Sequence, residues 1–180
     1  MSIGTVSDSH DNLPLLRAII IAAKQHGAQT ILSCGDRVAP STLHQLQFHG
    51  LPVDVIHGNN SGNFDRLVKL SYAPASLIHY HGQDADFTLG GKRIFLVHYP
   101  HYARAMAVTG DYDLVCYGHT HCISIETLKN IKGTQTVVCN PGTVGGIGAP
   151  ATYLFGDLET MTFETLPVTV IHQFIMMKGE

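Results

Sequence analysis

The amino-acid sequence predicts an α/β fold with two packed β-sheets. Over the first part of the chain, short apolar runs alternate with segments of helical spacing, whereas beyond residue 123 we find strand patterns only. Alternating strands and helices favour a parallel sheet with right-handed crossovers. We therefore expect two sheets packed face to face, with helices covering their outer faces, in a single domain over residues 1–180.

The first five elements follow the order β-α-β-α-β. They are a strand at 3–7, a helix from Pro14 to Gly27, a strand at 30–34, a helix from about Ser41 to His49, and a strand at 53–57. The first helix is well marked, because apolar residues recur at helical spacing between Leu15 and Ala23. Asp11 or Asn12 is a suitable N-cap for it.

The pattern changes after a helix that begins near Gly62. Strands are predicted at 76–80, 85–89 and 93–97, then a helix at 101–108, then strands at 114–117, 123–128, 135–139, 152–157 and, in two pieces, 161–175. Gly90-Gly91 indicates a hairpin turn, and Lys132-Gly133 and Asn140-Pro141-Gly142 indicate further turns.

Composition restricts the classes of function. The 11 Lys and Arg against 14 Asp and Glu give a net charge of −3, and without a basic run a dedicated nucleic-acid surface is disfavoured. No apolar stretch approaches the roughly 20 residues of a membrane span, and we see no signal segment, so we expect a cytoplasmic protein. The four cysteines lack C-x-x-C spacing, which predicts free thiols.

Seven side chains that can bind a metal follow five of the predicted strands. They are Asp8, His10, Asp36, Asn59, His98, His119 and His121. In open α/β sheets, ligands bind beyond the carboxyl ends of the strands, so we expect these side chains to meet. Residues i and i+2 of an extended segment share a face, so both members of Asp8/His10 and of His119/His121 should point the same way.

The chemistry of these ligands indicates a hydrolytic metal site. Imidazole, carboxylate and amide oxygen suit manganese, iron, zinc, cobalt or nickel rather than Cu(I) or an iron–sulfur cluster. Asp36 stands alone after its strand, and we expect its carboxylate to bridge two cations. Two metals roughly 3.5 to 4 Å apart can hold a hydroxide between them and bind phosphate oxygens, which predicts phosphoester hydrolysis by direct attack of water.

Six motifs stand in order along the chain. They are Ser7-Asp8-Ser9-His10, Gly35-Asp36, Gly58-Asn59, Val97-His98, Gly118-His119-Thr120-His121 and Asn140-Pro141-Gly142-Thr143. This order resembles the calcineurin-like metallophosphoesterases, in particular the small YfcE/MJ0936-type phosphodiesterase group, to which the retromer subunit Vps29 is also similar. The resemblance implies the metallophosphoesterase fold, a four-layer α/β/β/α sandwich, with two divalent metal ions. We expect manganese, with nickel, zinc, iron or cobalt as alternatives.

The resemblance also implies a division of the ligands. Asp8, His10, Asp36 and His121 would hold one metal, and Asp36, Asn59, His98 and His119 the other. Two positions depart from the family pattern: Asn60 stands where many members have a His that assists the leaving group, and His98-Tyr99-Pro100-His101 replaces the usual His-Gly-His. The candidate catalytic residues are Asp36, Asn59, Asn60, His98 and His101, with His101 or His57 as an alternative proton donor.

The loop after the third strand contains Gly-Asn twice, so the register of the amide ligand is ambiguous. Asn59 directly follows the apolar run at 53–56, whereas Asn63 is well placed to cap the next helix. We expect Asn59 to be the ligand and Asn63 to be the cap, because a strand end can deliver a side chain without a flexible extension.

The predicted function is metal-dependent hydrolysis of a small phosphoester, a phosphodiester rather than a monoester. The alternative is a Vps29-like protein-interaction scaffold with a vestigial or weakly active metal site. A nuclease for polymeric nucleic acid is disfavoured by the missing basic run. The C-terminal apolar segment 168–177 is compatible with a core strand or with the edge of a homo-oligomer, and we favour the core, since edge strands are usually blunted by charge.

Overall fold

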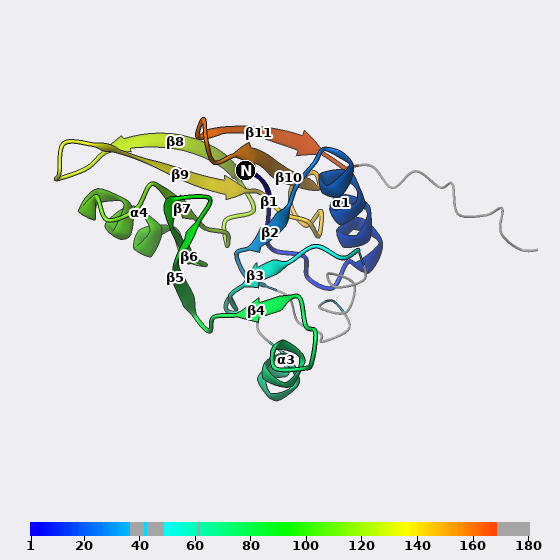
Figure 1. Ribbon diagram of the computed structural model, residues 1–180. Helices are drawn as coiled ribbons and strands as arrows, with labels where there is room; N and C mark the ends of the chain where they lie inside the picture. Colours follow the sequence, from blue (N-terminus) through cyan, green and yellow to red (C-terminus); the bar gives the residue numbers. More distant parts are fainter. Residues whose placement is uncertain (37–41, 43–48, 61, 169–180) are drawn as a thin grey trace, which may run out of the picture.

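The computed structural model describes residues 1–36, 42, 49–60 and 62–168, whose strands form two mixed sheets (Figure 1). Sheet A has the order β11 (Thr162–Pro167), β10 (Thr152–Asp157), β1 (Ser2–Val6), β2 (Thr30–Ser33), β3 (Val53–Val55) and β4 (Ile78–Tyr80). Sheet B has the order β5 (Asp84–Leu89), β6 (Lys92–Val97), β7 (Leu114–Cys116), β9 (Gln135–Pro141) and β8 (Ile123–Lys129). The expected α/β fold with two sheets is confirmed.

Sheet A contains strands from both ends of the described chain. β1 to β4 run parallel, as the alternation of strands and helices predicted. β10 pairs with β1 in the antiparallel direction, so Ser2 lies opposite Asp157. In sheet B, β5 and β6 form the hairpin predicted at Gly90-Gly91, and β7 runs parallel to both β6 and β9.

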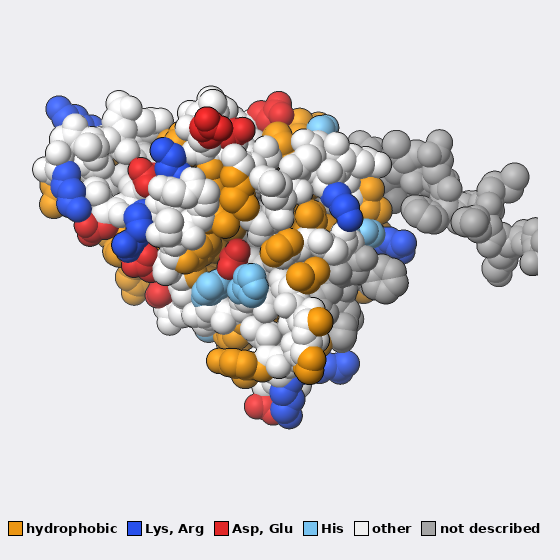
Figure 2. All heavy atoms as spheres, in the orientation of Figure 1, with side chains coloured by type: hydrophobic (Ala, Val, Ile, Leu, Met, Phe, Trp, Pro, Cys, Tyr) orange, Lys and Arg blue, Asp and Glu red, His pale blue; other side chains and the backbone are white. Residues whose placement is uncertain are grey.

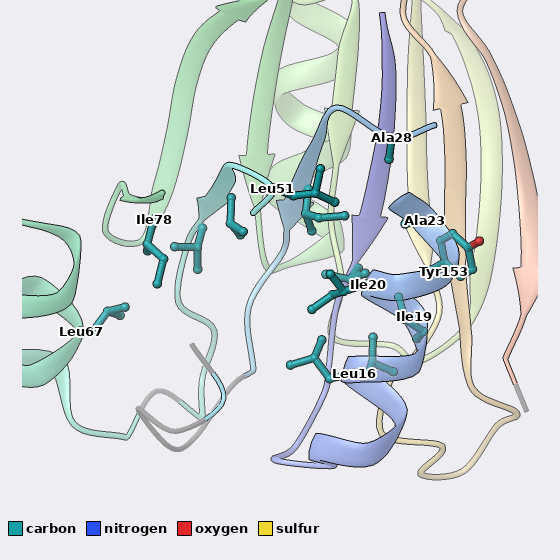
Figure 3. Packing of buried hydrophobic residues seen from close by; sticks show 14 residues of the cluster. Leu16, Ile19, Ile20, Ala23, Ala28, Leu51, Leu67, Ile78 and Tyr153 are labelled. Atoms are coloured by element: carbon teal, nitrogen blue, oxygen red, sulfur yellow. The ribbon is translucent and has the colours of Figure 1, made fainter. Parts of the chain in front are cut away.

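The core is divided into layers by the two-residue period of the strands. Ile31 of β2 packs in the cluster under α1 (Leu13–Gln25), whereas the next residue, Leu32, packs between the two sheets. Figure 3 shows the first of these clusters, in which Leu16, Ile19 and Ile20 of α1 face sheet A.

A third apolar cluster lies on the outer face of sheet B. Ala103 and Ala107 of α4 (Pro100–Thr109) pack there against Val115 of β7 and its neighbours, and the small alanines allow the helix to approach the sheet closely. The sequence of layers is therefore α1, sheet A, sheet B and α4, which is the expected four-layer arrangement.

The predicted helix caps are present. Of the two candidates before α1, Asn12 is the cap, and its side chain accepts a hydrogen bond from the Leu15 amide. Asn63 caps α3 (Phe64–Ser71) by accepting from the Arg66 amide at 3.1 Å, as expected. Both side chains satisfy a donor that the first helical turn leaves unpaired.

Some expectations lie outside the described residues. Of the helix predicted at 41–49 only Thr42, in helical conformation, and His49, in a turn, are described, and of the C-terminal run at 161–175 only Met161, β11 and Val168 are described. None of the described helices combines the length and apolar character that a membrane span requires. On the face shown in Figure 2, Lys and Arg side chains lie mostly towards the margins, while histidine and apolar side chains lie near the middle.

Candidate metal centre

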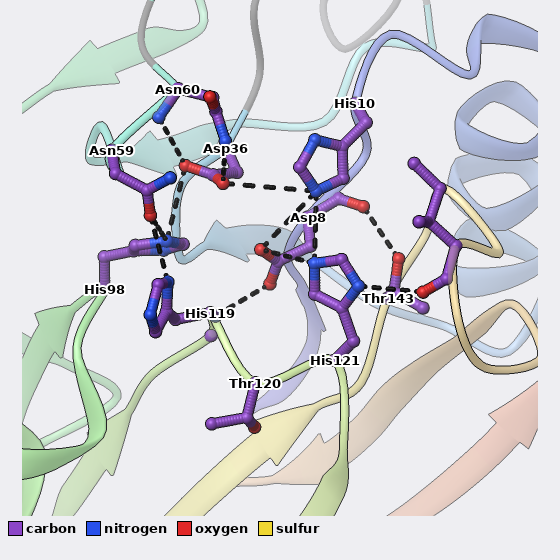
Figure 4. Close-up of polar contacts among 12 residues, drawn as sticks. Asp8, His10, Asp36, Asn59, Asn60, His98, His119, Thr120, His121 and Thr143 are labelled. Atoms are coloured by element: carbon purple, nitrogen blue, oxygen red, sulfur yellow. Dashed lines mark hydrogen bonds and ion pairs between the residues drawn. The ribbon is translucent and has the colours of Figure 1, made fainter.

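The candidate ligands come from the carboxyl ends of five strands. Asp8 and His10 follow β1, Asp36 follows β2, Asn59 follows β3, His98 follows β6, and His119 and His121 follow β7. Three of these strands belong to sheet A and two to sheet B, so the ends of both sheets meet at one place. Figure 4 shows the seven side chains pointing towards one another.

One half of the centre contains Asp8, His10 and His121. His121 Nε2 lies 3.1 Å from His10 Nε2 and 3.3 Å from Asp8 Oδ1, and His10 Nε2 lies 3.9 Å from the same oxygen. Asp8 is fully buried, and the two imidazoles are partly buried.

The other half contains Asp36, Asn59, His98 and His119. The Asn59 Oδ1 atom lies 3.0 Å from His98 Nε2 and 2.9 Å from His119 Nδ1. Asp36 Oδ1 lies 3.3 Å from His98 Nε2, and Asp36 Oδ2 lies 4.0 Å from His10 Nε2. Asp36 therefore reaches towards both halves, one oxygen to each.

Backbone carbonyls orient two of the imidazoles. His98 Nδ1 lies 2.7 Å from the Cys34 carbonyl, and His121 Nδ1 lies 2.8 Å from the Ile147 carbonyl. A carbonyl only accepts, so both Nδ1 atoms must carry a proton, and in the neutral ring Nε2 then presents its lone pair to the centre. These lone pairs meet the oxygens of Asn59, Asp36 and Asp8, which are acceptors as well.

Such a convergence of acceptors fits divalent cations. Asp8 Oδ1 is buried and accepts no hydrogen bond from any described residue, although a buried carboxylate is costly unless it is paired or bound to a metal. Among the described ion pairs, Asp8 and Asp36 contact histidines alone. Two compact sets of donor atoms, each within 4.8 Å of one another, are Asp8, His10 and His121, and Asp8, Asp36 and His98. In this geometry Asp8 is common to both sets.

Asn60 holds the Asp36 carboxylate. Its backbone amide donates to Asp36 Oδ1 at 2.9 Å, and its side-chain amide donates to Asp36 Oδ2 at 2.8 Å. The side chain at this position therefore fixes a candidate ligand, and the sequence had suggested only that an imidazole is missing here.

Two glycines make the close approach of these loops possible. A Cβ atom at Gly58 would collide with the Asp36 carboxylate and lie 2.8 Å from the His98 ring. A Cβ atom at Gly118 would collide with the Ser7 side chain and lie 2.7 Å from Asp8 Oδ2. Glycine is needed at both positions because any side chain would displace a candidate ligand.

The local backbone differs from the extended geometry that we expected for the paired motifs. Asp8, His10, His119 and His121 have φ angles of 53°, 41°, 72° and 58°, and Asp36 has 50°, all in the left-handed region. The expectation that residues i and i+2 share a face of an extended segment was wrong here, although both pairs do point into the centre. Non-glycine residues in this region cost of order 1 to 3 kcal/mol each and are concentrated at functional sites.

Asn140 supports the loop that carries His119 and His121. This buried side chain donates to the Gly118 carbonyl and to the Thr120 hydroxyl, both at 3.0 Å, and accepts from the Gly142 amide at 2.9 Å. Sequence reasoning placed Asn140 in a turn and in the last family motif, without assigning it a contact. A polar residue directly after the apolar run of β9 was a signal that it is buried with specific partners.

The suggested proton donors occupy different places. The ring of His101 lies 5.8 Å from Tyr99 and 4.3 Å from Tyr102, and no described contact joins it to a candidate ligand. His57 contacts the Tyr80 hydroxyl at 2.7 Å and the edge of Phe64. Burial and the neighbouring His98 lower the pKa of His57, against a raising effect of Asp84.

Comparison with known sequences identifies a family. A sequence model of the calcineurin-like phosphoesterase superfamily domain matches residues 1–161. The chain is also 29% identical over 151 residues to phosphodiesterase MJ0936 of Methanocaldococcus jannaschii, a match that covers 81% of this chain and 86% of that protein.

Solved structures show the same fold. An archaeal phosphodiesterase superposes with a TM-score of 0.81 at 25% identity, covering 93% of this chain and all of that chain. YfcE, a phosphoesterase from E. coli, superposes with a TM-score of 0.62 at 20% identity, covering 94% of this chain and all of that chain.

Proposed function

Because the chain belongs to the calcineurin-like phosphoesterase superfamily and is a phosphoric ester hydrolase, we propose that it hydrolyses a small phosphodiester at a dinuclear metal site. We propose that Asp8, His10, Asp36, Asn59, His98, His119 and His121 bind the two metals, and that residues 1–180 act as one domain. We further propose that the bound metal is manganese and that the protein is cytoplasmic.

The single observation that carries this proposal is the convergence of acceptors. Two buried carboxylates, an amide oxygen and the lone pairs of carbonyl-oriented imidazoles face one another without a described cationic side chain among them. Hard oxygen donors mixed with imidazole suit Mn²⁺ and its neighbours in the transition series. When bound, two such cations supply an activated water and neutralise phosphate oxygens.

The protein's own groups have separate tasks. The Cys34 and Ile147 carbonyls fix the tautomers of His98 and His121, and Asn60 fixes Asp36 between the two halves of the centre. Outer partners of this kind usually change metal affinity or activity by about 10- to 100-fold when removed. We therefore assign Asn60 to positioning Asp36, while Asp36, Asn59 and His98 would hold the metal ions that bind the phosphate.

Metal analysis joined to a substrate panel tests the proposal. The protein is stripped with a chelator, reloaded with Mn²⁺, Zn²⁺ or Ni²⁺, and analysed for bound metal before turnover is measured on bis(p-nitrophenyl) phosphate and p-nitrophenyl phosphate. We expect two metals per chain and faster hydrolysis of the diester. One metal per chain, or faster hydrolysis of the monoester, contradicts the dinuclear diesterase. Two bound metals without turnover on either ester would favour the scaffold function.

A further inference from the structure

A chain of aromatic rings leads away from the second half of the metal centre. The Tyr99 ring lies 5.3 Å from the His98 ring and 5.1 Å from the His119 ring, in a T-shaped arrangement with each. From Tyr99 the chain continues to His101 at 5.8 Å and to Tyr102 at 6.3 Å. We call Tyr99, His101 and Tyr102 the aromatic shelf.

Helix stability does not account for the shelf. Tyr99 is the N-cap residue of α4, but its side chain makes no capping hydrogen bond, and a Ser, Thr, Asp or Asn would stabilise the helix start by about 1 kcal/mol more. Instead the ring packs against two candidate ligands, which links the start of α4 to the metal centre.

Core packing does not account for the outer part of the shelf either. The buried face of α4 consists of Ala103 and Ala107, whereas Tyr102 is 49% exposed and His101 is exposed. None of the three apolar clusters formed by the described residues contains Tyr99 or Tyr102. The rings of Tyr102 and His101 are therefore exposed to solvent, next to Tyr99, which contacts the candidate metal centre.

The shelf favours a planar partner rather than a charged one. Arg104, the cation next along α4, is occupied by both oxygens of Glu126 at 2.9 and 3.0 Å. Exposed rings bind other rings by stacking, and a stacked base contributes about 1 to 3 kcal/mol. Tyr102 is connected to His119 through Tyr99 by two ring contacts, of 6.3 and 5.1 Å.

We propose that the aromatic shelf binds a planar aromatic group of the substrate while the phosphate lies at the metal centre. The inference rests on the proposed function and specifies its substrate class: phosphodiesters that carry an aromatic group, either a nucleobase or a simple aryl ester. Tyr102 and His101 would determine specificity, and Tyr99 would position both the shelf and the ligand rings.

Equilibrium binding of matched monophosphates tests this proposal without turnover. Calorimetry on the metal-loaded protein compares adenosine 5′-monophosphate with ribose 5-phosphate, which differ only in the base, and phenyl phosphate with methyl phosphate. We expect each aromatic member to bind roughly 5- to 150-fold more tightly, equivalent to about 1 to 3 kcal/mol of stacking. A larger gain in affinity within the adenosine pair than within the phenyl pair indicates a nucleobase site. Similar gains in the two pairs indicate a general aryl site.

Variants connect the effect to the shelf. Tyr102→Ala should remove most of the preference for the aromatic member and leave the affinity for ribose 5-phosphate unchanged. Val108→Ala is the matched control, because Val108 is 44% exposed on the same helix and is not part of the shelf. Unchanged melting temperatures establish that both variants are folded.

The outcomes separate the shelf from the catalytic proposal. Equal affinity for the two members of each pair, or a preference that survives in both Tyr102→Ala and His101→Ala, overturns the shelf even if the diester is hydrolysed. An aromatic preference that depends on Tyr102 supports the shelf even if metal analysis contradicts the dinuclear site.

Discussion

Asp36 lies between the two halves of the candidate metal centre. It is 2% exposed, and its two oxygens face His98 and His10 in opposite halves. Asp36→Asn keeps the shape of the side chain and removes the charge that would hold two cations. We expect turnover to fall by several orders of magnitude with the fold intact, as measured by circular dichroism and steady-state kinetics. Near-normal turnover at saturating Mn²⁺ would contradict the two-metal mechanism.

Asn60 acts on the same carboxylate through two hydrogen bonds. Asn60→Ala removes the side-chain donor to Asp36 Oδ2, so we expect metal affinity to fall by roughly 10- to 100-fold, measured by calorimetry. Asn63→Ala is the control, because it removes only the cap of α3, at a cost of about 1 kcal/mol in the free energy of unfolding. If metal binding is weakened in the Asn63 variant and not in the Asn60 variant, the assignment of this loop is wrong.

That the seven candidate ligands meet could be predicted, but their backbone conformation could not. Their convergence was predicted because each of their motifs follows an apolar run. The left-handed φ angles of five of the ligands depend on tertiary contacts, such as the hydrogen bond from the Asp8 amide to the Gly35 carbonyl at 3.1 Å. The acceptors that orient His98 and His121 are backbone carbonyls, which every residue has, so no sequence pattern could have indicated Cys34 or Ile147.

At the scale of elements, the end of β9 supports the loop that follows β7. Asn140 is fully buried and binds two groups beside His119 and His121, the Gly118 carbonyl and the Thr120 hydroxyl, and also the Gly142 amide. Asn140→Ala removes all three bonds and leaves the buried Gly142 amide without its described acceptor, at about 1 to 3 kcal/mol, so we expect both a lower melting temperature and weaker metal binding.

A second buried asparagine provides the matched control. Asn130 lies at the far end of β8 and bonds to Thr134 and Thr136 within the β8–β9 hairpin. Asn130→Ala should lower the melting temperature as well, without changing metal stoichiometry. Equal metal binding in both variants would show that Asn140 has a structural role only.

The order of the elements could be predicted, but the pairing of the strands could not. Short apolar runs identified β1 and β2, and helical spacing identified α1, because each of these signals is local in the sequence. The pairing of β10 with β1 depends on a neighbour from the other end of the chain, and β10 has no local signal that names its partner. For the same reason β4 was found as a strand and not as a member of the parallel sheet.

The enzyme as a whole is expected to depend steeply on the leaving group. The side chain of Asn60 is engaged with Asp36, and neither His57 nor His101 has a described contact with a carboxylate ligand. A positioned general acid contributes about 10²- to 10⁴-fold, so esters with poor leaving groups should react most slowly. Rates on a series of substituted phenyl methyl phosphates measure this dependence. A flat dependence would indicate a proton donor, and comparison of His57→Ala with His101→Ala would identify it.

The convergence of two sheets on one centre has a thermodynamic consequence. Asp8 from sheet A accepts the His119 amide from sheet B at 3.0 Å, and the candidate ligands of each half are drawn from both sheets. Ions that bind there stabilise the contact between the sheets, because the unfolded chain cannot assemble the ligands. At a hundredfold excess over Kd this linkage is worth about 2.7 kcal/mol. The melting temperature should therefore rise with metal concentration. Chelation should weaken the contact between the sheets at the ends of the strands before the middles of the strands unfold.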